Sequence, residues 1–142
     1  MAGGATAVRS GAELEQAVAA LATSLGLDVR RQVRVARRLW GAERRIDIVV
    51  SRADSHQSLG MECKWQSVGG SAEEKIPAII QDIGAWPIPG LVVFAGEGFS
   101  PNMKSYLHST GKAISFDELD GWLCLFFGLS DPADEQTPGH LL

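Results

Sequence analysis

Three charged residues stand inside the most apolar stretches of the sequence. Asp47 interrupts the run IDIVV, and Glu62 and Lys64 interrupt the run MECKW. Two carboxylates held close together repel one another, and burying them without a partner is costly. A divalent cation relieves that cost, because Mg²⁺ prefers oxygen ligands and binds through one or two carboxylates together with phosphate oxygens and waters. A neighbouring lysine can orient a water molecule and neutralise charge on a phosphate, so this trio suits metal-assisted phosphodiester hydrolysis.

The period of two along a strand predicts where these groups can meet. Glu62 and Lys64 share one face of a strand, and their apolar neighbours take the other face, toward the core: Met61, Cys63 and Trp65. In the same way, Asp47 is predicted to face away from three apolar neighbours: Ile46, Ile48 and Val50. If the two strands are adjacent, the three charged side chains converge. The alternative is a structural cluster of ion pairs on an exposed face of the sheet.

Apolar periodicity predicts the elements that would hold this trio. Helical spacing begins near Ser10, Ser71, Ser100 and Ser115, and all of these except Ser100 have a glutamate three residues later, as in a capping box. Strands are predicted over 29–39, 45–51, 60–65, 91–95 and 113–115, the first three as an antiparallel meander. We therefore expect one α/β domain, with an αβββαβ core and a mixed central sheet flanked by helices, over residues 1–130. Residues 131–142 are polar and are expected to form a flexible tail.

Charge is distributed unevenly along the chain. The net charge is −4, yet residues 1–60 carry nine arginines against six acids, and residues 61–142 carry four lysines against eleven acids. Seven of the arginines lie between Val29 and Arg45, where alternation places Val29, Val33 and Val35 on one face and Arg30, Gln32 and Arg34 on the other. Arginine forms forked hydrogen bonds to phosphate, so this segment favours contact with a nucleic acid backbone. The alternative is a solvated face of a hairpin.

Several classes of protein are disfavoured by the composition. No apolar run is long enough to cross a membrane, and residues 1–10 lack the apolar core of a signal peptide. We therefore expect a cytoplasmic protein whose two cysteines, Cys63 and Cys124, are reduced. The three histidines are scattered and no C-x-x-C pair occurs, so a zinc site is not indicated.

The aspartate, the E-x-K triplet and the order of elements resemble the PD-(D/E)XK nuclease superfamily, over roughly residues 10–96. The resemblance implies that Asp47 and Glu62 bind a metal together with the backbone carbonyl of Cys63, and that Lys64 is the catalytic lysine. The implied cofactor is Mg²⁺, with Mn²⁺ able to substitute. Ile46 stands where the family's name has proline.

The resemblance also suggests a helical glutamate near the metal, as many members have one. Glu13 already serves in a capping box, so we favour Glu15, with a solvated helix charge as the alternative. Gln66 continues the face of Glu62 and Lys64 and is expected to reach water or phosphate, unless it is only a polar strand end. Contacts with DNA are expected from six basic residues: Arg30, Arg34, Arg38, Arg44, Arg45 and Lys75. For Lys75, a solvated side chain is the alternative.

The predicted function is a Mg²⁺-dependent DNA endonuclease. Restriction, homing, junction-resolving, phage and mobile-element types remain open. Because one active site cuts one strand, we expect a homodimer or higher homo-oligomer, acting on DNA and not at a membrane. Two alternatives are a non-catalytic nucleic-acid-binding domain that retains the fold, and an RNA or repair-complex subunit that is active only with a partner.

Overall fold

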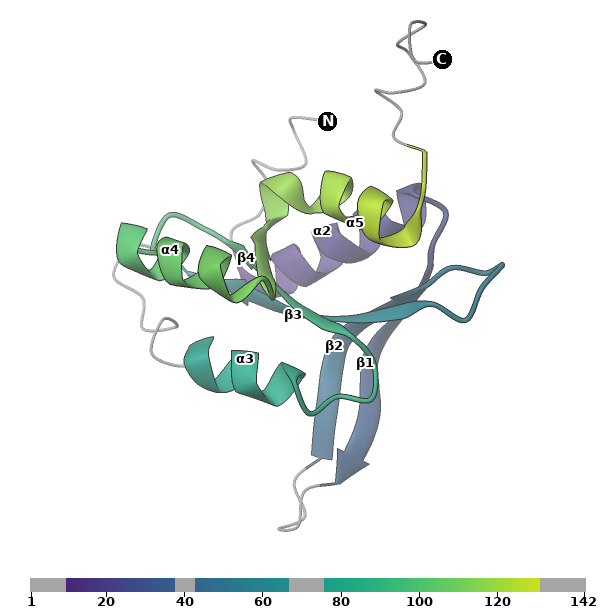
Figure 1. Ribbon diagram of the computed structural model, residues 1–142, viewed down its shortest axis with the longest axis horizontal. Helices are drawn as coiled ribbons and strands as arrows, with labels where there is room; N and C mark the ends of the chain where they lie inside the picture. Colours follow the sequence, from purple (N-terminus) through teal and green to yellow (C-terminus); the bar gives the residue numbers. More distant parts are fainter. Residues whose placement is uncertain (1–9, 38–42, 67–75, 131–142) are drawn as a thin grey trace, which may run out of the picture.

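The computed structural model describes residues 10–37, 43–66 and 76–130. The helices and strands follow one another in the predicted order (Figure 1). The helices are α2 (Gly11–Ser24), α3 (Ile76–Ile83), α4 (Pro101–Thr110) and α5 (Leu119–Phe127), the last preceded by a short 3₁₀ turn, η2 (Phe116–Glu118). The strands are β1 (Asp28–Arg37), β2 (Glu43–Ser51), β3 (Ser58–Trp65), β4 (Gly90–Ala95) and β5 (Ala113–Ser115).

The five strands form one mixed sheet in the order β1-β2-β3-β4-β5. The pairs β1–β2 and β2–β3 are antiparallel, which confirms the predicted meander. The pairs β3–β4 and β4–β5 are parallel, and each is joined by a crossover that contains a helix, α3 or α4. The chain is therefore a single α/β domain, as expected from the sequence.

Helices cover both faces of this sheet, with α2 and α5 on one side and α3 and α4 on the other (Figure 1). Strand β4, which lies between β3 and β5, shows the two cores most clearly. Leu91 and Val93 belong to the cluster under α2 and α5, whereas Val92 and Phe94 pack toward α3 and α4. All four residues are buried, as expected for an apolar run in a strand covered on both faces.

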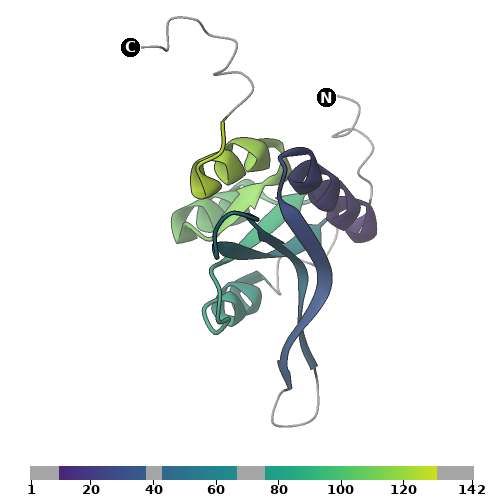
Figure 2. The same cartoon turned by 90° about the vertical axis from the view of Figure 1, so that its right-hand side faces the viewer.

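Strands β2 and β3 separate partway along their length. Their pairing runs only from Ser51 opposite Ser58 to Ile48 opposite Met61. Beyond that point β2 stays with β1, and β3 stays with β4. The ribbon of β1 and β2 then runs away from the helices (Figure 2). We call the divergence point, beyond Ile48 and Met61, the fork.

At the fork the predicted alternation fails. Val29 packs against the α2 cluster, but Val33 and Val35 pack against the α3 cluster, so the three valines do not share one face. On β2, Ile48 and Val50 lie in the α2 cluster, whereas Ile46 lies in the α3 cluster. The reason lies in the backbone: Gln32 has φ 53°, which rotates the following residues of β1 relative to the preceding ones.

The predicted helix caps are correct in part. Ser10 accepts a hydrogen bond from the Glu13 amide, 3.2 Å, and Ser100 caps α4 by accepting from Met103. Ser115 instead donates its hydroxyl hydrogen to the Glu118 carboxylate, and a 3₁₀ turn begins there. Residues 71–75, including the predicted cap of the helix before β4, and the predicted tail 131–142 lie outside the described residues. Within the described ranges, no helix combines the length and apolarity that crossing a membrane requires.

Candidate functional site

The fork brings the two predicted metal-binding carboxylates face to face. Ile48 pairs with Met61, and Asp47 and Glu62 are the next residues of the two strands beyond that pair. The Asp47 carboxylate also accepts a hydrogen bond from the Cys63 amide, 3.0 Å away. A side chain of β2 thus bonds the backbone of β3 at the point where backbone pairing between the strands has ended.

The electrostatics of Glu62 reflect the nearness of the Asp47 carboxylate. Burial, followed by the negative charge of Asp47, raises the pKa of Glu62 from 4.5 to about 7, although the ammonium of Lys64 acts in the opposite direction. A carboxylate with this pKa is poorly stabilised by its protein surroundings alone. A divalent cation between Asp47 and Glu62 would relieve both the burial cost and the repulsion, so these two residues fit the implied metal.

Cys63 lies at the centre of this negative field. Its side chain is buried in the α2 cluster, as predicted. Burial raises the pKa of the thiol, and the charges of Asp47, Glu15 and Glu62 raise it further. Because the thiol packs in the α2 cluster, the backbone carbonyl is the group of Cys63 expected at a metal.

Glu15 reaches the fork from α2. Its Oε1 atom accepts hydrogen bonds from Arg31, at 3.2 and 3.3 Å, and from the side-chain amide of Gln32, at 3.0 Å. The same Gln32 nitrogen lies 3.5 Å from Oδ1 of Asp47. Glu15 is thus connected to Asp47 through one side chain. The amide of Glu13 is engaged in the cap by Ser10, one turn earlier in the helix.

Lys64 and Gln66 follow Glu62 along β3. Lys64 is half-buried and close enough to Glu62 to lower the pKa of that carboxyl. Gln66 is only 3% exposed, and its Nε2 donates to the carbonyl of Gly98, 2.7 Å away, in the loop between β4 and α4. This bond gives Gln66 a visible structural role, and its contact with water or phosphate stays a prediction.

The predicted basic residues divide between the two faces of the ribbon. Arg30 is opposite Val49, which belongs to the α3 cluster, whereas Arg34 is opposite Arg45 and faces away from that cluster. The prediction that Arg30 and Arg34 share a face is therefore wrong, because the backbone turns at Gln32 between them. Arg34 and Arg45 form one exposed pair next to the fork. Arg38 and Lys75 lie outside the described residues, and only the backbone of Arg44 is described.

Two residues at the site were missed by the sequence analysis. Arg31 forms a salt bridge with Glu15, with side chains 47% and 16% exposed respectively. Gln32 bonds both Glu15 and Asp47. A polar side chain in a valine-rich strand was the available signal for Gln32, but strand alternation assigned it to the arginine face. Its left-handed backbone cannot be predicted from its residue type.

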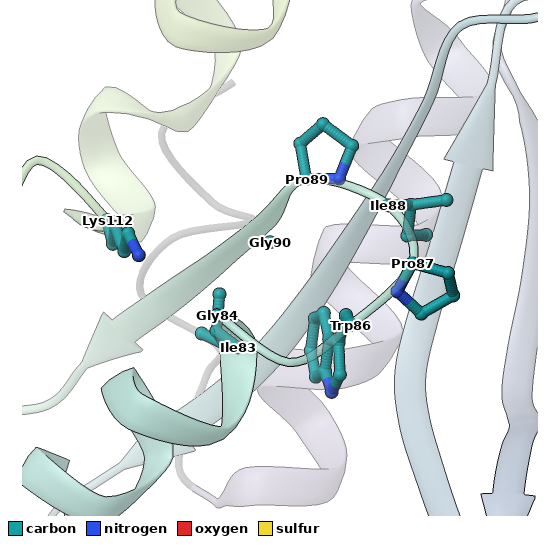
Figure 3. A pocket seen from close by; sticks show the side chains of 8 residues that line it. All are labelled: Ile83, Gly84, Trp86, Pro87, Ile88, Pro89, Gly90 and Lys112. Carbon is teal, nitrogen blue, oxygen red and sulfur yellow. The ribbon is translucent and has the colours of Figure 1, made fainter.

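A separate pocket is formed by the end of α3, the loop that joins α3 to β4, and Lys112 just before β5 (Figure 3). It is lined mainly by small and apolar residues: Ile83, Gly84, Trp86, Pro87, Ile88, Pro89, Gly90 and Lys112. None of the predicted catalytic residues lines it. In the described part of the chain, no group of three or more His, Cys, Asp and Glu side chains is placed to hold a metal. The predicted metal site uses only two such side chains, Asp47 and Glu62, together with the backbone carbonyl of Cys63.

Comparison with known proteins supports the fold. No curated protein matches the sequence significantly. Two solved structures share the fold: a protein of unknown function, AF1548 (TM-score 0.50, 20% identity), and protein VC1899 from Vibrio cholerae (TM-score 0.58, 16% identity). The matches cover 72% and 83% of this chain but only 56% and 34% of theirs.

A family model places the sequence more specifically. The model described as a PD-(D/E)XK nuclease superfamily domain matches residues 6–119, which include α2, all five strands, α3, α4 and the start of α5. This range contains Asp47, Glu62 and Lys64, together with the element order that the sequence predicted. The chain therefore belongs to the PD-(D/E)XK nuclease superfamily.

Proposed function

We propose that this domain is a Mg²⁺-dependent DNA endonuclease whose active site is the fork between β2 and β3. The observation that supports the proposal best is the juxtaposition of Asp47 and Glu62 where the two strands separate, with Lys64 two residues along β3. A structural ion-pair cluster would place opposite charges in contact. Here two carboxylates lie close together, an arrangement that costs stability unless a cation binds between them or one of them takes up a proton.

Each residue has a defined role in this proposal. Asp47, Glu62 and the carbonyl of Cys63 would hold the metal, and Glu15 assists from α2. When bound, Mg²⁺ supplies a Lewis acid for the scissile phosphate and lowers the pKa of an attacking water. Lys64 orients that water, accepts its proton or neutralises charge that develops on the phosphate. Mn²⁺ is expected to replace Mg²⁺ because it accepts the same oxygen ligands.

DNA is the proposed substrate because exposed arginines lie beside the carboxylates. Arg34 and Arg45 are cross-strand partners on the ribbon that runs out from the fork. A phosphate backbone placed along this ribbon would receive forked hydrogen bonds while a neighbouring phosphate reaches the fork. Cleavage of both strands would need two copies of the domain, so we propose a homodimer or higher homo-oligomer.

Plasmid nicking tests the activity. With Mg²⁺, the wild-type protein should convert supercoiled plasmid to the open circle, and EDTA should stop the reaction. Lys64→Ala should lower the rate at least about 100-fold, as expected for loss of general acid–base chemistry or of charge stabilisation. Lys104→Ala, on the exposed side of α4, is the charge-matched control and should cut at the wild-type rate.

The same assay decides between the proposal and a non-catalytic DNA-binding domain. Binding should be retained in Lys64→Ala, measured by the mobility shift of a labelled duplex in Ca²⁺. Wild-type protein that binds DNA but cuts neither plasmid, linear duplex, single strands nor a four-way junction would support the binding-domain alternative. The comparison among these substrates also assigns the type of nuclease.

A further inference from the structure

Gln32 is the residue that connects two acidic side chains of different elements. Its Nε2 lies 3.0 Å from Oε1 of Glu15 on α2 and 3.5 Å from Oδ1 of Asp47 on β2. An amide nitrogen carries two hydrogens, so it can direct one toward each carboxylate. The reversed amide would point its carbonyl oxygen at two anions, which fixes the orientation of the side chain.

The backbone of Gln32 adopts a conformation that is unfavourable for its residue type. Among the described residues, Gln32 is the one non-glycine with a positive φ, 53°. A left-handed conformation is unfavourable for a glutamine and persists only where the surroundings compensate. Gln32 lies between the pairs Arg31–Ile48 and Val33–Ile46, at the level of Asp47. The turn of the backbone therefore occurs at the position that faces the candidate site.

The neutral amide of Gln32 also suits a position between two carboxylates. A neutral amide reduces the repulsion between two carboxylates by donating hydrogen bonds to both, and it leaves their negative charges intact. Arg31 already balances the charge of Glu15, so a second cation at position 32 would act mainly on Asp47 and compete with a metal for it. The bonds to Glu15 from Arg31 and Gln32 all reach Oε1, and none of them uses Oε2.

We infer that Gln32 is a positioning residue of this site: its strained backbone and its amide hold the carboxylates of Glu15 and Asp47 at a fixed separation for binding a divalent cation. The inference rests on the proposed function only for the role of this site in catalysis. The contact itself does not depend on catalysis, and it can be measured in metal-free protein.

Three substitutions separate the side chain from the backbone. Gln32→Met keeps the length of the side chain and removes the donor. Gln32→Gly removes the donor and accepts a positive φ without strain. Gln32→Asn tolerates the left-handed conformation and keeps a donor that is one methylene shorter. Gln81→Met, at an exposed position on α3, is the control for the change from Gln to Met.

Mn²⁺ affinity measured by isothermal titration on the full chain is the main readout. The inference predicts about tenfold weaker binding for Gln32→Met and for Gln32→Gly, a smaller loss for Gln32→Asn and no change for Gln81→Met. Thermal unfolding without metal should show Gln32→Gly at least as stable as Gln32→Met. Mn²⁺ binding of wild-type strength in Gln32→Gly would mean that only the backbone matters, and it would overturn the inference.

A double-mutant cycle keeps the inference testable if the domain binds no metal. Gln32→Met and Asp47→Asn are combined, and denaturant unfolding is followed in EDTA. Non-additive effects on stability are expected, because each substitution removes the same contact. Additive effects would overturn the inference in any event. Failure of wild-type protein to bind Mn²⁺ or to nick plasmid, with the cycle still non-additive, would count against the proposed function alone.

Discussion

At the scale of single residues, the fork is defined by two carboxylates that would repel one another without a cation. That they could meet was predicted from the sequence, because two neighbouring strands with charged residues at these positions allow the side chains to converge. The position of Gln32 could not be predicted in this way. It depends on a single backbone dihedral that tertiary contacts impose, and glutamine has no intrinsic preference for it.

The raised pKa of Glu62 predicts a pH-dependent stability for the metal-free protein. In the unfolded chain this carboxyl loses its proton near pH 4.5, whereas in the fold it does so near pH 7, so the folded state binds more protons between these values. The contribution of Glu62 to stability is therefore fully present below pH 4.5 and is lost as the pH rises through 7. The expected loss is at most about 3 kcal/mol.

Denaturant unfolding in EDTA between pH 4.5 and 8 measures this dependence. Glu62→Gln should flatten the fall in stability, because its amide does not titrate. Glu97→Gln, at an exposed position after β4, should keep the wild-type profile. Identical profiles for the wild type and Glu62→Gln would show that the carboxylates of Asp47 and Glu62 do not interact in the fold.

At the scale of elements, the type and order of helices and strands were largely predictable, and the faces of β1 and β2 were not. The valines and isoleucines that alternation assigned to the apolar faces of β1 and β2 are buried or half-buried: Val29, Val33, Val35, Ile46, Ile48 and Val50. Ile46 and Val33, however, lie on the α3 side, because the ribbon turns at the fork. The two packing environments are equally apolar. Hydrophobicity alone therefore could not distinguish between the faces beyond Asp47.

The end of β3 is held by a close contact with the turn after β4. Gly96 has φ 103°, and a Cβ added there would lie 2.2 Å from the Gln66 carbonyl oxygen. Gly111 also has a positive φ, 68°, but a Cβ there would meet nothing within 4 Å. We expect Gly111→Ala to cost about 1 kcal/mol from backbone strain alone. Gly96→Ala should cost about 3 kcal/mol or more, because the backbone of β3 must move.

Urea unfolding of the two variants compares these costs directly. Because Lys64 is only two residues before Gln66, Gly96→Ala should also slow plasmid nicking under conditions where it remains folded. Gly111→Ala should cut at the wild-type rate. Equal destabilisation by the two substitutions would mean that the contact between Gly96 and Gln66 does not constrain β3.

At the scale of the whole molecule, the basic and acidic halves of the sequence correspond to different parts of the structure. The basic half of the sequence forms α2 and the ribbon of β1 and β2, and the acidic half forms the body that carries α3, α4 and α5. Arg34 and Arg45 lie as a pair on the ribbon next to the carboxylates. The net charge of −4 is therefore compatible with a local surface that attracts a phosphate backbone.

Salt dependence of DNA binding tests this surface. Arg34→Ala and Arg45→Ala should each weaken binding to a duplex about three- to tenfold at low salt. Each should also reduce the slope of log affinity against log salt by about one, because one phosphate contact is lost. Fluorescence anisotropy in EDTA measures both quantities, and Lys104→Ala on α4 should change neither. An unchanged slope in both arginine variants would place the DNA elsewhere on the domain.

The central claim is that Asp47 and Glu62 hold one divalent cation at the fork between β2 and β3. A crystal of the protein soaked in Mn²⁺ tests it most directly, because the anomalous signal of manganese locates the ion without reference to activity. The account predicts one strong peak about 2.2 Å from carboxylate oxygens of both residues, close to the carbonyl of Cys63, and its loss in Asp47→Asn. A well-ordered fork without a peak, or a peak that touches neither carboxylate, would contradict it.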